Sequence, residues 1–368
     1  MSNGQATSSV SGNWSSPLIW SPAAPTAGQT VTIPAGVTVY VDVTTVMISD
    51  LIVNGTLIIN SDATSDLNIA GNITINGNSI LENNGGIHIN TPASSFTILG
   101  TGVYIHNPFS NVLSDESIFY NCNESFSTTS TLQIKKWFNG SIPLGDPSRV
   151  QTSNFGNLIL EANVPGGQWD QDGYFSLPTA ARVKGNLTVN SGTIIMDDGS
   201  GNTTSLVLQN VTVNNFANII FQRGSNRNLT LTTGSFNLNS NAPAAPTVIL
   251  DTSYGILNWT INGNLNLSHD FSAVNSGNYS TGADIRITVN GDLNYSKGNV
   301  CLVNKADAPL RLTVTGNANI NNTAGLGSMS FIEGGNGALT FSAANFNLQA
   351  GSNNYLLGSP TSGQQYKG

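Results

Sequence analysis

The chain has 368 residues with a formal net charge of −8, and only 9% of its residues are Asp, Glu, Lys or Arg. This negative balance, with no basic cluster larger than the pair Lys135 and Lys136, excludes an electrostatic surface for nucleic acid. The longest apolar runs have the length of a strand, so we expect no segment to insert into a membrane. The 39 glycines and the lack of long helix-forming runs predict an all-β protein.

The first part of the chain divides into a terminus and a set of closely spaced strand patterns. Residues 1–10 have neither the basic start nor the apolar core of a secretion signal, and we expect them to be an added or processed terminus. Residues 11–106 are expected to cap the fold and to form its first coils. Within them, alternating apolar residues follow glycines at positions 55, 71, 86 and 102, and this spacing of 15 or 16 residues indicates two corners per coil.

Residues 107–182 interrupt this regularity. Only short strand patterns persist there, for example SIFYN from Ser117 and NLILEANV from Asn157. We therefore expect this segment to form irregular coils with loops that stand off the rest of the fold.

Residues 183–368 contain seven copies of one short phrase, in which a turn residue precedes apolar residues two positions apart. The turn positions are 24 to 29 residues apart: Gly185, Asn210, Gly234, Gly263, Gly291, Gly316 and Ala344. A repeat of this length with a strand pattern and no helical segment is typical of one coil of a parallel β-helix. One coil cannot bury its own apolar face, whereas stacked coils enclose a core in which each Ile, Leu or Val contributes about 1.5–3 kcal/mol.

Each copy of the phrase also predicts the direction of its side chains. Apolar pairs such as Leu187 and Val189 share the inward face of a strand, and the Thr, Asn and Ser residues between them can form hydrogen-bonded ladders between coils. The Gly or Asn at each corner is expected to supply the positive φ angle of a tight bend.

The amino-terminal part resembles a known kind of surface domain. Two tryptophans, Trp14 and Trp20, precede the pattern Pro-x-x-Gly-x-x-Val-x-Ile-Pro-x-Gly from Pro25 to Gly36. This opening resembles that of large surface proteins from Bacteroidetes-type bacteria, and it is similar to the eight-glycine domain of animal surface proteins linked to hyaluronan. The GNLTVNSG phrase at Gly185 resembles the repeats of long exported adhesins. The resemblance implies a right-handed β-helix on or outside a cell, as one piece of a larger adhesin.

The irregular segment contains the candidate binding residues. Trp137, Phe138, Trp169 and Tyr174 are flat aromatic residues outside the repeats, and sugars stack their apolar C–H faces on such rings. We predict a carbohydrate-binding subsite here. The alternative is that these rings pack a loop onto the wall of the solenoid.

Two carboxylates in the same segment, Asp170 and Asp172, point to one side of an extended chain. Acidic turns with glycine supply oxygen ligands to Ca²⁺, so calcium is the one cofactor that the sequence leaves open, and a solvated acidic turn is the alternative. The pair is also a candidate for the two carboxylates of a glycoside hydrolase. His88 and His106 are expected to face solvent on adjacent coils, and two histidines are too few for a zinc site.

These observations together predict an all-β, right-handed parallel β-helix (β-solenoid) with an irregular, loop-bearing middle segment. The function that they favour is a structural and adhesive segment of an extracellular or cell-surface protein. Its expected partners are a glycan or another cell-surface component and the neighbouring segments of a larger chain. No complete catalytic motif is evident. A polysaccharide lyase or glycoside hydrolase is the alternative, because parallel β-helices are known to host such enzymes.

Overall fold

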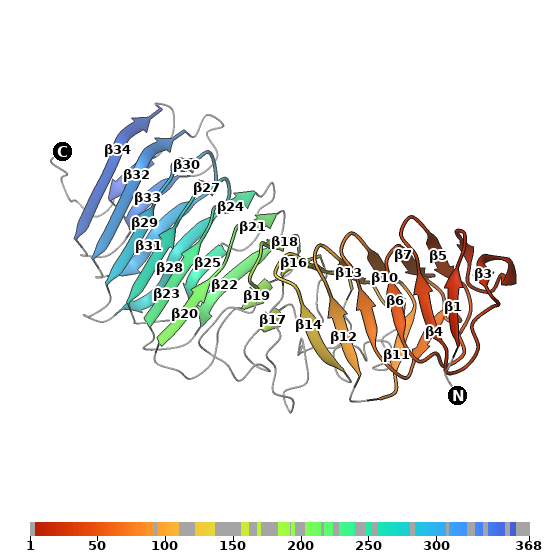
Figure 1. Ribbon diagram of the computed structural model, residues 1–368. Coiled ribbons are helices and arrows are strands. Elements are labelled where there is room, and N and C mark those ends of the chain that lie inside the picture. The colour runs from red at the N-terminus through yellow and green to blue at the C-terminus, as the bar shows by residue number, and fades with distance from the viewer. Residues whose placement is uncertain are drawn as a thin grey trace. The chain divides into compact units, whose positions relative to one another are not determined.

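The computed structural model of the protein describes residues 4–91, 94–109, 122–136, 156–161, 168–170, 183–191, 193–195, 203–214, 217–223, 228–239, 247–251, 256–279, 284–306, 309–321, 328–333, 338–349 and 354–357. Within these ranges the chain forms strands and one 3₁₀ turn, η1 (Pro17–Ile19) (Figure 1). It divides into two compact units: residues 1–167 with 182–185 form unit 1, and residues 168–181 with 186–368 form unit 2.

Unit 1 is a stack of coils with three faces, and the strands of each face pair in parallel with the strand one coil later. Face A contains β1 (Gln5–Ser8), β4 (Thr30–Ile33), β6 (Leu51–Val53), β9 (Ile73–Ile75), β12 (Ser95–Ile98) and β14 (Asn123–Phe126). Face B contains β2 (Gly12–Asn13), β5 (Thr38–Val41), β7 (Thr56–Ile59), β10 (Ile80–Asn83), β13 (Val103–His106), β15 (Thr131–Ile134) and β16 (Asn157–Leu160). Face C contains β8 (Asp66–Ile69) and β11 (Gly86–Ile89).

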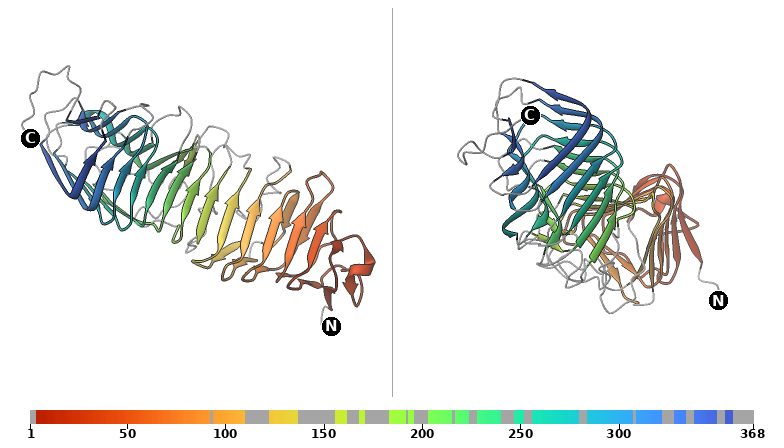
Figure 2. Two further views of the ribbon diagram at one scale, coloured as in Figure 1. Left: turned by 90° about the horizontal axis from the view of Figure 1, so that it is seen from above. Right: turned by 90° about the vertical axis from the view of Figure 1, so that its left-hand side faces the viewer.

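Unit 2 repeats this plan, and its successive strands lie side by side in Figure 2. Face D contains β18 (Leu187–Val189), β21 (Val211–Asn214), β24 (Phe236–Asn239), β27 (Leu265–Leu267) and β30 (Leu293–Tyr295). Face E contains β20 (Thr203–Val207), β23 (Asn228–Thr233), β26 (Leu257–Ile261) and β29 (Ile285–Val289). Two long strands contribute to both faces: β32 (Leu310–Ile320) and β34 (Leu339–Leu348). Face F contains β17 (Gln168–Asp170), β19 (Thr193–Ile195), β22 (Asn218–Arg223), β25 (Thr247–Asp251), β28 (Phe271–Tyr279), β31 (Val300–Ala306), β33 (Met329–Glu333) and β35 (Asn354–Leu357).

The core of each unit is made by the inward residues of successive strands. In β26, for example, the inward residues Leu257, Trp259 and Ile261 are buried and the residues between them are partly exposed. Aromatic rings pack against one another inside unit 2, where the ring centroid of Trp259 lies 5.3 Å from that of Phe236, edge to face, and 6.1 Å from that of Phe271, at a tilt. The predicted all-β, parallel β-solenoid class is therefore confirmed. Of the segment expected to be irregular, the described residues include β14 to β17, and the expected loops lie outside the described residues.

The amino-terminal end of unit 1 is closed by a small antiparallel addition. Within the stretch expected to be a terminus, β1 pairs in parallel with β4 and antiparallel with β3 (Trp20–Ser21). Trp14 and Trp20 are both buried, pack edge to face at 4.8 Å, and share a hydrogen bond from Trp20 Nε1 to the Trp14 carbonyl at 2.9 Å. This turn covers a strand edge that would otherwise be open to pairing with another chain.

The repeat glycines show a difference from the sequence-based expectation. Gly55, Gly185, Gly263 and Gly291 do not adopt a positive φ angle. A Cβ atom at Gly55 would collide with the carbonyl oxygens of Pro34 and Val37, which belong to the preceding coil. These positions thus require glycine because neighbouring coils approach closely at the corner, and not because the bend is left-handed.

The expectation that His106 faces solvent is wrong. In β13 the inward residues are Tyr104 and His106, which register with Leu81 and Asn83 of β10, and His106 is fully buried. The Tyr104 hydroxyl lies 3.0 Å from His106 Nδ1, and Asn83 Nδ2 donates a 3.4 Å hydrogen bond to the same hydroxyl. His88 lies on a different face, in β11, and is half-buried.

Within the described residues, no helix has the length and apolar character needed to cross a lipid bilayer.

Candidate functional site

The residues singled out from the sequence fall mostly outside the described part of the chain. Trp137, Phe138, Asp172 and Tyr174 lie there, so the aromatic subsite and the calcium site stay predictions. Their neighbours Trp169 and Asp170 form part of β17, where they register with Ile194 and Ile195 of β19.

The titratable groups that the structure describes form only small contacts, such as that of Asp284 with Arg286 and Arg311. Among them, no three His, Cys, Asp or Glu side chains are grouped so that they could hold a metal ion. His88 Nε2 and Asp66 Oδ1 lie 3.5 Å apart on face C, with side chains about a quarter exposed. In the exposed turn before that face, hydrogen bonds from Thr64 and Ser65 lower the pKa of Asp62. The contact of His88 with Asp66 joins two neighbouring strands and the bonds to Asp62 stabilise a surface turn, and neither gives an indication of a catalytic centre.

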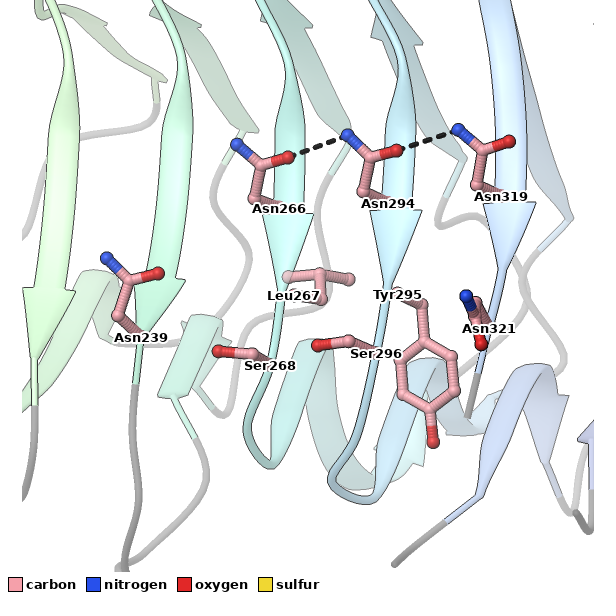
Figure 3. Close-up of a pocket in the computed structure, with 9 residues that line it drawn as sticks. All are labelled: Asn239, Asn266, Leu267, Ser268, Asn294, Tyr295, Ser296, Asn319 and Asn321. Carbon is pink, nitrogen blue, oxygen red and sulfur yellow. Dashed lines mark hydrogen bonds between the residues drawn. The ribbon is translucent and has the colours of Figure 1, made fainter. Parts of the chain in front are cut away.

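The candidate site is a groove on face D of unit 2. Its volume is about 350 Å³, and its walls come from the carboxyl ends of β24, β27, β30 and β32 (Figure 3). The lining residues are Asn239, Asn266, Leu267, Ser268, Asn294, Tyr295, Ser296, Asn319 and Asn321. This set contains carboxamides, hydroxyls and apolar atoms and no charged side chain.

One wall of the groove is a ladder of asparagines. Five residues in register on successive coils form it: Asn237, Asn266, Asn294, Asn319 and Asn347. From Asn266 onward, each Nδ2 donates to the Asn Oδ1 of the preceding coil, at distances of 2.6, 2.8, 2.8 and 2.7 Å. Because the sequence places Asn at the same outward position of five successive coils, the carboxamides align without further sequence signals. Each interior carboxamide retains a second N–H and a further lone pair for a ligand.

The residues beneath the groove are fixed in place. Leu267 and Tyr295 belong to its lining, but their side chains occupy buried inward positions of β27 and β30, each with only 1% of its surface exposed. The Tyr295 hydroxyl donates to the Gly298 carbonyl at 2.8 Å. The Ser268 hydroxyl donates to the Leu238 carbonyl at 2.6 Å. The groove is therefore held in shape before any ligand enters, which reduces the entropy cost of binding.

We expect Asn294→Ala to lower the free energy of unfolding by about 1–2 kcal/mol. The substitution removes two ladder hydrogen bonds and leaves the partly buried carboxamides of Asn266 and Asn319 without these partners. Urea denaturation followed by circular dichroism measures the change.

The matched control is Asn347→Ala. This residue is exposed at the last rung and makes one ladder hydrogen bond, to Asn319, so its loss should be smaller. Equal losses for the two variants would show that the ladder bonds do not stabilise the coils.

The sequence contained a signal for this groove that periodicity alone does not reveal. Polar ladders between coils are an expected consequence of the repeat. The groove depends on the position just after each inward pair of apolar residues. On four successive coils this position is occupied by Asn239, Ser268, Ser296 and Asn321, so two serines interrupt a row of asparagines.

Comparison with known proteins gives one match. Residues 19–107 match the family model of the G8 domain, and this span lies within unit 1. No curated protein and no solved structure matches the chain. The resemblance of the amino-terminal segment to the eight-glycine domain is thereby confirmed. G8 domains are typical of extracellular proteins, so the match and the parallel solenoid fit an extracellular structural segment.

Proposed function

We propose, from the G8 match in unit 1 and the groove on unit 2, that this chain is a structural and adhesive segment of an extracellular protein and that it contacts glycans. The coils supply the structural part, because strands of successive coils pair in parallel and the stack buries an apolar core in each unit. The groove supports the adhesive part. It displays carboxamides and hydroxyls at fixed positions, and these groups hydrogen-bond the hydroxyls of sugars.

The groove favours binding over turnover. General acid–base catalysis needs a titratable group within hydrogen-bond reach of the moving proton. The groove is lined by asparagine, serine, leucine and one tyrosine, and the hydroxyl of that tyrosine is bonded to the backbone of its own coil. We therefore expect a ligand to leave the groove unchanged.

Retention on immobilised polysaccharides tests this function. The 368-residue chain is passed over neutral and uronate-containing glycans while new reducing ends and unsaturated products are followed. We expect retention on a glycan without formation of either product. Retention on none would contradict the adhesive part. Steady product formation would contradict it in favour of a lyase or hydrolase, the alternative that the fold also permits.

A further inference from the structure

The groove exists because a second asparagine ladder on face D is interrupted. This ladder occupies the position directly after each inward pair, two residues from the first ladder and on the same outward side of the strands. Asn214 Nδ2 donates to Asn190 Oδ1 at 2.8 Å, and Asn239 Nδ2 donates to Asn214 Oδ1 at 3.4 Å. The next two rungs are serines.

Backbone hydrogen bonds show that the serines occupy true ladder positions. The amides of Ser268, Ser296 and Asn321 donate to the carbonyls of Leu238, Leu267 and Tyr295 at 3.0, 3.0 and 2.9 Å. The three positions therefore follow one another coil by coil. Serine lacks the carboxamide that bridges adjacent coils, so two rungs are missing between Asn239 and Asn321 (Figure 3).

The gap has a definite length and direction. At the spacing of paired strands, about 4.8 Å, the three steps from Asn239 to Asn321 cover about 14 Å along the coil axis. The uninterrupted ladder of Asn266, Asn294 and Asn319 runs parallel to it as a wall. The opening is thus an elongated slot. The carboxamides of Asn239 and Asn321 lie at its two ends, and the asparagine ladder forms one of its long sides.

The side chains that line the slot favour an uncharged ligand. The slot offers donors and acceptors in similar number and no ionised side chain. A charged group that lost its water here would find no opposite charge, whereas a hydroxyl, which both donates and accepts, would replace its water bonds. We propose that the slot between Asn239 and Asn321 is a subsite for a neutral oligosaccharide that lies along the coil axis. This inference rests on the proposed adhesive function and assigns it a place and a ligand class.

The test is to restore the missing rungs. Ser296→Asn places a carboxamide inside the slot next to Asn321, and the double variant Ser268→Asn with Ser296→Asn rebuilds the ladder. Binding of the whole chain to neutral oligosaccharides, manno- and xylo-oligosaccharides among them, is measured by calorimetry beside thermal unfolding. We expect the single variant to bind the neutral glycan at least about tenfold more weakly. Its melting temperature should be unchanged or higher, because it adds a side chain that fits an existing ladder.

Ser205→Asn is the matched control. Ser205 is exposed on face E, in β20, where it registers with Thr230 and lies outside the slot, so this variant should bind as the unaltered chain does. Ser296 is exposed, so its substitution is expected to leave the fold intact. The double variant also removes the hydrogen bond from the Ser268 hydroxyl, and if that loss disturbs the fold, the single variant still tests the slot.

The outcomes separate this inference from the proposed function. Neutral-glycan binding that is equal in the unaltered chain and in Ser296→Asn would overturn the slot and leave the adhesive function to another surface. Binding restricted to uronate-containing glycans would overturn the ligand class. If the unaltered chain binds no glycan, both the slot and the adhesive function are overturned.

Discussion

Leu238→Ala is expected to lower the free energy of unfolding by about 2–5 kcal/mol, because the side chain is buried in a close-packed stack and its removal leaves a cavity. Leu238 is 1% exposed. It belongs to an inward column that registers coil by coil with Val213 before it and Leu267 after it. Stacked strands above and below restrict the relaxation that could fill the space. Urea denaturation followed by circular dichroism measures the loss.

The chain provides an internal control of the same residue type. Leu348 belongs to the same column, which continues through Tyr295 and Ile320, but it lies in β34 and is 55% exposed. Leu348→Ala should change the free energy of unfolding by less than about 0.5 kcal/mol. If both variants lost the same stability, burial between coils could not be the source of the effect.

Gly85→Ala is expected to destabilise unit 1 by about 1–3 kcal/mol or more, because the added methyl group has no space. An ideal Cβ at this position would overlap the Ser65 carbonyl oxygen and would lie 2.7 Å from Ile59 Cγ2 and 2.9 Å from the Asn60 carbonyl oxygen. Two of these contacts are with backbone atoms of the preceding coil, which cannot move without breaking strand pairing. A lower melting temperature and a lower urea midpoint are the expected observations.

Gly77→Ala controls for the general effect of replacing a glycine. The nearest atom to a Cβ there is Thr101 N at 3.7 Å, an ordinary van der Waals contact, and its φ angle is not left-handed. This variant should be neutral or stabilised by about 0.4–1 kcal/mol, since alanine restricts the unfolded chain. A loss equal to that of Gly85→Ala would contradict the close-approach explanation.

The candidate site was less accessible to sequence reasoning than the fold. The amino acids named as candidates were chosen for their chemistry, and four of the six lie outside the described residues. The slot was missed because none of its residues is unusual by itself. Ser268 and Ser296 stand out only when they are aligned with Asn239 and Asn321. That alignment depends on which positions of successive coils stack on one another.

The sequence by itself determined the parallel solenoid and the direction of most side chains. Strand alternation and repeat length can both be recognised from the order of the residues, without knowledge of the contacts between coils. Residues 257–261 illustrate this, since their inward and outward positions follow directly from the pattern. Only the tertiary structure decided what depends on contacts between coils. In the segment VYIH every residue could face inward, and the register of β13 on β10 selects Tyr104 and His106. Gly55 and Gly85 likewise are required because of carbonyl groups in the coil before them, which lie 18 to 25 residues away in sequence. The slot also depends on contacts between coils, because the gap between Asn239 and Asn321 exists only when their coils are stacked.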